Sequence, residues 1–175
     1  MNRVLPVLMV LLLTAGCKTI SDPSPYHRYL ISDFDFKSAN IFVRQIEGLT
    51  SINNISVTDL PKTGIEFRVN GQHIFTDTTF TNMPNFYSYK KRAAEIDVSP
   101  NALLQVLNSF FGINADSYRK EEGFYMFTSE SYLSYEKGYI YNATQRFKVG
   151  DSIFKGRTYY ITRQVDSTWF EYKYP

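Results

Sequence analysis

Residues that build covalent or metal cross-links are scarce in this chain of 175 residues. It has one cysteine, Cys17, and two histidines, His27 and His73. A single cysteine excludes a disulfide within the chain, and neither histidine has a second ligand at a recognisable metal-site spacing. We therefore expect no metal and no cofactor, and we interpret both histidines as surface or hairpin-edge residues.

An excess of charge of one sign is also missing, because 19 basic side chains are balanced by 17 acidic ones. Proteins that bind nucleic acid commonly carry a strong basic excess, which neutralises phosphate. The near-neutral balance excludes nucleic acid as an expected partner and does not indicate a polybasic membrane patch. The only basic run, at residues 90–92, is interpreted as a solvated loop.

The local motifs of common hydrolases and nucleotide-binding proteins are absent. The serines stand in neither G-x-S-x-G nor S-x-x-K, and there is no glycine-rich phosphate loop. Asp33 and Asp35 would share one face of an extended segment, where paired carboxylates bind calcium or transfer protons. Because Phe34 and Phe36 alternate with them, we interpret the segment as a half-buried strand or a helix start. No catalytic residue is named, although a triad assembled from distant residues leaves catalysis open.

Long hydrophobic runs are lacking as well. The longest apolar segment, residues 4–13, is interrupted by Pro6, follows Arg3 and precedes the small residues 14–16. It is too short to span a bilayer as a helix, which takes about 20 residues. The order of positive, apolar and small residues is that of a secretory signal, so we predict that residues 1–16 are a signal peptide.

The end of this segment, Leu13-Thr14-Ala15-Gly16-Cys17, resembles the lipobox of bacterial lipoproteins. In that family the cysteine becomes the first mature residue and carries lipid on its thiol and amine. The resemblance implies lipidation of Cys17 and attachment to a membrane, although Thr14 replaces the usual leucine. The family's sorting rule implies that Lys18 directs the protein to the outer membrane, facing the periplasm. The alternative is an ordinary signal peptide cut near Ala15.

The mature chain is predicted to hold a flexible tether at residues 17–25, which is polar and contains two prolines, and one domain at residues 26–175. Residues 38–47 have apolar side chains at helical spacing before Gly48. A stronger helix is predicted over residues 100–111, with Ser99 as N-cap and Pro100 at its first position. Its apolar stripe consists of Leu103, Leu104, Val106, Leu107, Phe110 and Phe111.

Aromatic side chains are abundant, at 17% of the chain, and favour β-structure. Strands are predicted at residues 55–59, 65–69 and 72–80, the last two joined by an Asn70-Gly71 hairpin turn before a loop at residues 82–85. The C-terminal half alternates aromatic runs with turn residues at 136–138, 149–151, 155–156 and 166–167. These runs cover residues 124–129, 132–135, 139–147, 152–154, 158–165 and 168–174. The expected fold class is α+β, an antiparallel sheet packed by one or two helices.

Tyrosines crowd these C-terminal strands and suggest an exposed aromatic binding face. Its expected residues are Tyr139, Tyr141, Tyr159, Tyr160, Tyr172 and Tyr174. The alternative is that the second sheet face simply carries amphipathic tyrosines with wet hydroxyls. The sequence thus predicts a non-catalytic binding or envelope-assembly lipoprotein whose partner is another envelope protein or a glycan. A small envelope hydrolase or glycan-processing enzyme is the alternative, distinguished by a deep pocket with a carboxyl group of displaced pKa.

Overall fold

A computed structural model describes residues 33–60, 64–75, 88–132, 135–144 and 147–175. The predicted signal peptide, Cys17, the tether and His27 lie outside the described residues, as does the loop predicted at 82–85. Within the described ranges, no helix combines the length and the apolar composition needed to cross a bilayer.

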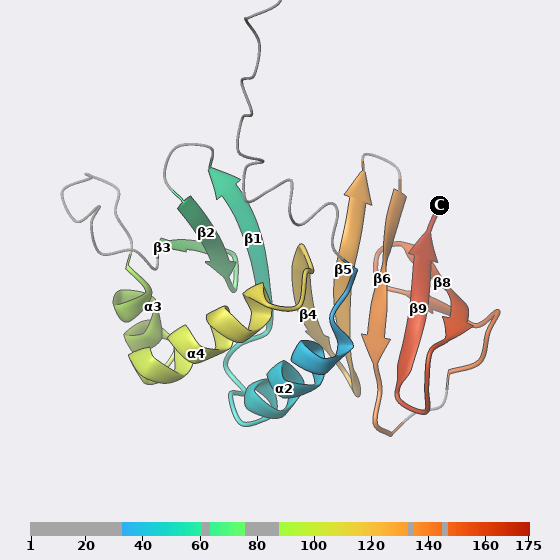
Figure 1. The fold of residues 1–175 in the computed structure, drawn as a ribbon, viewed down its shortest axis with the longest axis horizontal. Coiled ribbons are helices and arrows are strands. Elements are labelled where there is room, and N and C mark those ends of the chain that lie inside the picture. The colour runs from blue at the N-terminus through green and yellow to red at the C-terminus, as the bar shows by residue number, and fades with distance from the viewer. Residues whose placement is uncertain (1–32, 61–63, 76–87, 133–134, 145–146) are drawn as a thin grey trace, which may run out of the picture.

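The described residues form one nine-stranded antiparallel sheet with three helices, which confirms the predicted α+β class (Figure 1). The strand order is β3-β2-β1-β4-β5-β6-β9-β8-β7. The helices are α2 (Phe36–Glu47), α3 (Tyr89–Glu95) and α4 (Pro100–Phe111). The strands are β1 (Asn54–Leu60), β2 (Gly64–Val69), β3 (Gln72–Phe75), β4 (Ser117–Glu121), β5 (Phe124–Tyr132), β6 (Tyr135–Tyr141), β7 (Ser152–Phe154), β8 (Thr158–Gln164) and β9 (Trp169–Tyr174).

Two helices begin where their capping residues stand. The Asp35 carboxylate accepts the N–H groups of Lys37 and Ser38 at 2.9 and 3.2 Å, so α2 begins earlier than residue 38. The helix predicted over residues 100–111 is confirmed, with the Ser99 hydroxyl accepting a hydrogen bond from the N–H of Ala102 at 3.1 Å. Its stripe packs toward the sheet, and Leu107 is fully buried.

The interpretation of residues 90–92 as a loop is wrong, because they belong to α3. The Ser88 hydroxyl caps this helix by accepting the N–H of Lys91 at 3.3 Å. Arg92 Nε donates to the Val69 carbonyl at 3.2 Å, and Ala93 is buried. A helix of seven residues shows only two buried side chains, Tyr89 and Ala93, which is too few for a periodic pattern in the sequence.

The predicted turn at residues 136–138 is also wrong, since these residues lie inside β6. Strands β5 and β6 pair up to Tyr132 and Tyr135, so the first and last residues of the strand predicted at 132–135 belong to two different strands. Gly138 lies opposite Thr128, where a Cβ atom would collide with the backbone of Phe127. Glycine is therefore required here for close packing. Further on, β6 ends at Tyr141, short of the predicted residue 147.

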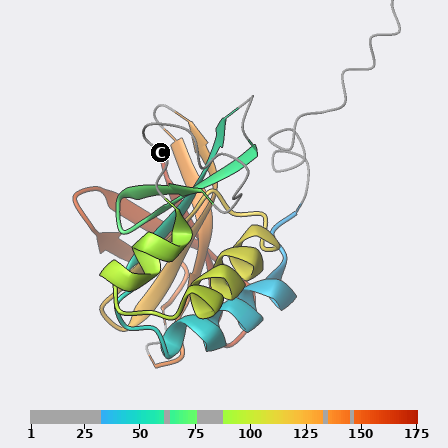
Figure 2. The same ribbon diagram turned by 90° about the vertical axis from the view of Figure 1, so that its left-hand side faces the viewer.

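The two faces of the sheet carry separate apolar clusters. Helices α2 and α4 cover one face, where Phe42 lies against Phe110 and Tyr118 with ring centroids 5.6 and 4.9 Å apart (Figure 2). The second cluster consists of Phe124, Met126, Ile140, Tyr159, Ile161, Phe170 and Tyr172. The sheet coils around this cluster, because Lys155 Nζ, beyond β7, lies 3.0 Å from Glu121 Oε2 on β4.

Candidate functional site

The six tyrosines predicted as one binding face are divided between the two faces of the sheet. Tyr139 and Tyr141 belong to the cluster beneath the helices, whereas Tyr159, Tyr172 and Tyr174 belong to the second cluster. This division follows from the register, because neighbours along a strand point to opposite faces. Tyr139, Tyr159 and Tyr172 are buried, Tyr141 and Tyr174 are half-buried, and Tyr160 is 46% exposed.

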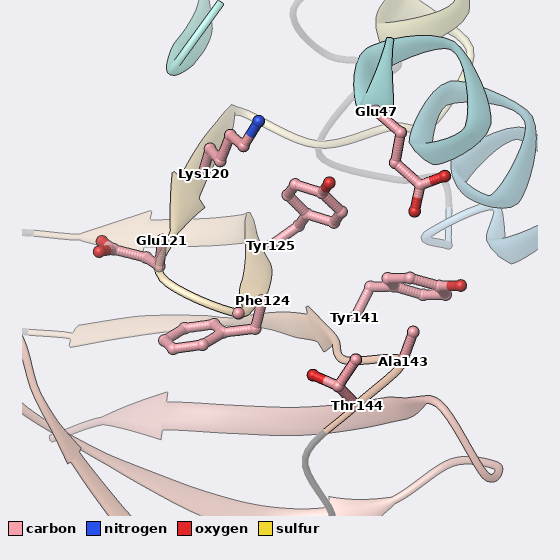
Figure 3. Close-up of a pocket in the computed structure, with 9 residues that line it drawn as sticks. Glu47, Lys120, Glu121, Phe124, Tyr125, Tyr141, Ala143 and Thr144 are labelled. Atoms are coloured by element: carbon pink, nitrogen blue, oxygen red, sulfur yellow. The ribbon is translucent and has the colours of Figure 1, made fainter. Parts of the chain in front are cut away.

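Tyr141 does reach a hollow of about 220 Å³ at one end of the sheet (Figure 3). Glu47 contributes to it from the end of α2 and Lys120 from β4, while Tyr125 and Tyr141 come from β5 and β6. The remaining lining residues are Glu121, Gly123, Phe124, Ala143 and Thr144. We call this the tyrosine hollow.

Strand pairing fixes the floor of the tyrosine hollow. Tyr125 and Tyr141 are cross-strand partners, with ring centroids 6.1 Å apart and planes inclined by 20°. Tyr141 packs edge-on against Trp169 at 5.2 Å. Trp169 is fully buried and donates its indole N–H to Asn40 Oδ1 at 3.0 Å. A rigid residue therefore holds the floor in place, which favours binding because less conformational entropy is lost.

Opposite charges line the rim of the tyrosine hollow. Figure 3 shows the Glu47 side chain extending from α2 toward the two tyrosine rings, whereas Glu121 and Phe124 point away from them. Burial and the nearby Glu47 carboxylate raise the pKa of Tyr125. The Tyr125 hydroxyl thus keeps its proton at neutral pH and can both donate and accept hydrogen bonds. The site offers flat apolar rings together with hydrogen-bonding groups of both kinds.

Sequence reasoning did not single out Glu47, Lys120 or Tyr125. Glu47 belonged to a predicted helix and Tyr125 to a predicted strand, but no local motif joins them. Their proximity depends on the packing of α2 over β5. The alternation of residues along the strand at 124–129 was the available signal, because it places Tyr125 and Phe127 on one face.

Searches of protein-family models, curated proteins and solved structures find no match to this chain. Function is therefore inferred from the geometry of the chain itself.

A polar cluster lies on the opposite face of the sheet, beside a cavity of about 160 Å³. The hydroxyls of Thr128 and Tyr172 both donate to Glu136 Oε1, at 3.0 and 2.9 Å. Arg119 lies with its guanidinium carbon 5.9 Å from the Tyr159 ring centroid, and its Nε is 2.8 Å from Glu121 Oε1. Together with the Lys155–Glu121 ion pair, these contacts connect β4 to β8 and to the turn after β7, and we interpret the cluster as structural.

The acidic pair noted in the sequence does not assemble a site. Hydrogen bonds from the Ser38 hydroxyl and from backbone N–H groups lower the pKa of Asp35, consistent with its role as a helix cap. The backbone carbonyl of Asp33 accepts a hydrogen bond from Asn114. Among the described residues, no group of three or more potential ligands is placed to hold a metal ion. His73 is half-buried in β3.

Proposed function

We propose that this protein is a lipid-anchored outer-membrane lipoprotein that binds an envelope glycan, without catalysis, in the tyrosine hollow. The signal-like segment and the lipobox ending at Cys17 support the anchor. The paired rings of Tyr125 and Tyr141, held rigid by Trp169 beneath a charged rim, support the glycan.

The tyrosine hollow suits a sugar because a pyranose ring presents C–H groups on its faces and hydroxyls around its edge. The C–H face packs on an aromatic ring, and the hydroxyls pair with groups such as Glu47 and Lys120. The volume of about 220 Å³ is smaller than that of sites for drug-sized ligands, which start at roughly 300 Å³. It accommodates one sugar unit of a longer chain.

The alternative function, a small hydrolase or glycan-processing enzyme, calls for a carboxyl group of displaced pKa within a pocket. Burial, assisted by Glu130, raises the pKa of Asp116 to about 6. Asp116 does not line the tyrosine hollow. The geometry therefore supports binding better than hydrolysis.

Glycan binding is tested by calorimetric titration of the protein with soluble envelope glycan fragments. Replacing Tyr125 with alanine removes half of the aromatic floor, and we expect affinity to fall roughly tenfold. Tyr160→Ala removes an exposed tyrosine elsewhere and serves as the matched control. Equal affinity in the wild type and Tyr125→Ala, or no binding by the wild type, would contradict the proposal.

The anchor is tested separately in bacterial cells fed labelled palmitate. The wild type should take up label and fractionate with the outer membrane, and Cys17→Ser should abolish the label because the thiol is the alkylated group. Unlabelled wild-type protein recovered in the soluble periplasmic fraction would rule out the anchor. That outcome would leave the binding result untouched.

A further inference from the structure

Exposed hydrophobic side chains gather on one hairpin of the molecule. In the part of the chain that the structure describes, four large hydrophobic side chains are exposed. Three belong to residues 148–160: Val149 at 62%, Phe154 at 74% and Tyr160 at 46%. Ile41 on α2 is the fourth. We call Val149, Phe154 and Tyr160 the hairpin patch.

The register of β7 and β8 places Phe154 and Tyr160 on the same face. Phe154 lies opposite Thr158, and Ser152 lies opposite Tyr160. The intervening residues, Ile153 and Tyr159, pack into the second cluster on the inner face. The hairpin therefore buries Ile153 and Tyr159 on its inner face and exposes Phe154 and Tyr160 on its outer face. It lies at the edge of the sheet, beyond β9 (Figure 1).

The hairpin is locally basic although the chain as a whole is nearly neutral. Residues 148–160 contain three basic side chains and one acidic one, Asp151, whose carboxylate accepts the N–H of Lys148 at 2.7 Å. In the adjoining strand, Lys173 lies directly opposite Tyr160. The basic residues of the hairpin are Lys148, Lys155 and Arg157. Lys148 and Arg157 are exposed, whereas Lys155 forms the ion pair with Glu121.

We propose that the hairpin patch is a membrane-contact surface that enters the interface of a bilayer rich in anionic lipid. Phenylalanine and valine side chains insert at the boundary of the acyl chains, and tyrosine sits at headgroup level with its hydroxyl in water. Lysine and arginine then pair with lipid phosphates. Lys148 stands next to Val149 and Lys173 lies directly opposite Tyr160, so two of the three apolar residues have an adjacent cation, whereas Lys155 beside Phe154 is paired with Glu121.

A lipid surface suits this patch better than a protein partner does. The cores of protein–protein interfaces are depleted of charged residues, and of lysine in particular. Here Lys148 flanks Val149 and Lys173 lies opposite Tyr160. The patch has only three apolar side chains, which is too small to form a standard interface core. Contact with lipid does not depend on the tyrosine hollow, and a lipid anchor at Cys17 would strengthen it by raising the local concentration of hairpin at the bilayer.

Tryptophan fluorescence in the full-length protein tests this contact. Phe154→Trp and Ile41→Trp are each compared with the parent chain, whose single tryptophan, Trp169, is buried. The proteins are added to vesicles of brominated phosphatidylcholine, with or without roughly one third phosphatidylglycerol. We expect blue-shifted and quenched emission from Phe154→Trp in the anionic vesicles, weaker quenching in the zwitterionic ones, and no change from Ile41→Trp.

Charge reversal measures how much the basic side chains of the hairpin contribute to membrane contact. In the Phe154→Trp background, Lys148→Glu with Arg157→Glu should reduce the quenching in anionic vesicles by roughly half or more. The matched control, Arg44→Glu with Lys90→Glu, changes the net charge equally at exposed positions on α2 and α3 and should leave quenching intact.

Three outcomes would overturn the proposal. The protein could float with the vesicles while the emission of Phe154→Trp is neither shifted nor quenched. That result would show that the domain is attached to the membrane elsewhere. A blue shift that grows with protein concentration and without vesicles would indicate a second copy as the occupant. A shift that requires envelope protein and not lipid would indicate a protein partner.

Discussion

The two faces of the sheet bury their aromatic residues in different ways. One face is covered by α2 and α4, and its cluster contains Phe42, Phe110 and Trp169. The other face has no covering helix among the described residues, and it is closed by the sheet's own coiling. Polar groups take part there, because Thr128, Glu136 and Tyr172 form hydrogen bonds within it.

This difference explains why large residues alternate on both faces of the C-terminal strands. Tyr139 and Tyr141 pack under the helices, whereas Ile140 between them is buried in the second cluster. A strand buried on both faces shows no alternation between apolar and polar residues. The tyrosine-rich composition of the C-terminal strands therefore reflects burial on both faces of the sheet. It does not mark a single exposed aromatic stripe.

The helix-covered face should be the more sensitive to truncation. Leu107 is fully buried at the centre of the α4 stripe, so Leu107→Ala should lower the free energy of unfolding by about 2–5 kcal/mol. Urea denaturation checks this, with the exposed Lys90→Ala as control, for which we expect little change. A urea midpoint for Leu107→Ala equal to that of the wild type would show that the packing of α4 contributes little to stability.

A buried carboxyl group should make stability depend on pH. Burial and then Glu130 raise the pKa of Asp116 from 3.8 to about 6. Folding therefore favours the protonated Asp116 carboxyl. The stability of the folded protein that depends on this group is fully present below pH 3.8 and is lost as pH rises through about 6. The loss amounts to roughly 2–3 kcal/mol.

Asp116→Asn should remove this part of the pH dependence and unfold at a higher urea concentration than wild type at pH 7. The comparison requires urea titrations at several pH values between the two pKa values, with the exposed Glu122→Gln as control. Parallel pH profiles for Asp116→Asn and wild type would show that the Asp116 carboxyl is solvated in the folded protein.

The sequence predicted elements that depend on local chemistry. Ser99 and Pro100 mark the start of α4, and Asn70-Gly71 joins β2 to β3, with both residues at positive φ. It did not predict β4, because Ser117–Glu121 is polar and its membership of the sheet depends on pairing with β1 and β5. Local propensity carries no information about such partners.

The candidate site was predictable only in part. Aromatic richness correctly drew attention to tyrosines, and Tyr141 lines the tyrosine hollow. Which tyrosines are buried depends on strand register and on the coiling of the sheet, and neither is encoded in a single strand. Near-neutral net charge likewise concealed the basic hairpin, since a sum over the chain averages over local excesses.

The smallest expected effect lies on the coiled face. Tyr172→Phe removes a hydroxyl that donates to Glu136 Oε1 at 2.9 Å and lies 3.1 Å from Thr128 Oγ1, while the buried ring remains. A hydrogen bond to a charged group contributes roughly 1–3 kcal/mol, and Glu136 keeps its bond from Thr128, so we expect a loss of about 1 kcal/mol. Urea denaturation of Tyr172→Phe beside Tyr160→Phe measures it, and the exposed Tyr160 hydroxyl should contribute nothing detectable. If Tyr172→Phe were as stable as wild type, apolar burial alone would hold the coil of the sheet. The two faces would then differ in what covers them and not in the kind of interaction that stabilises them.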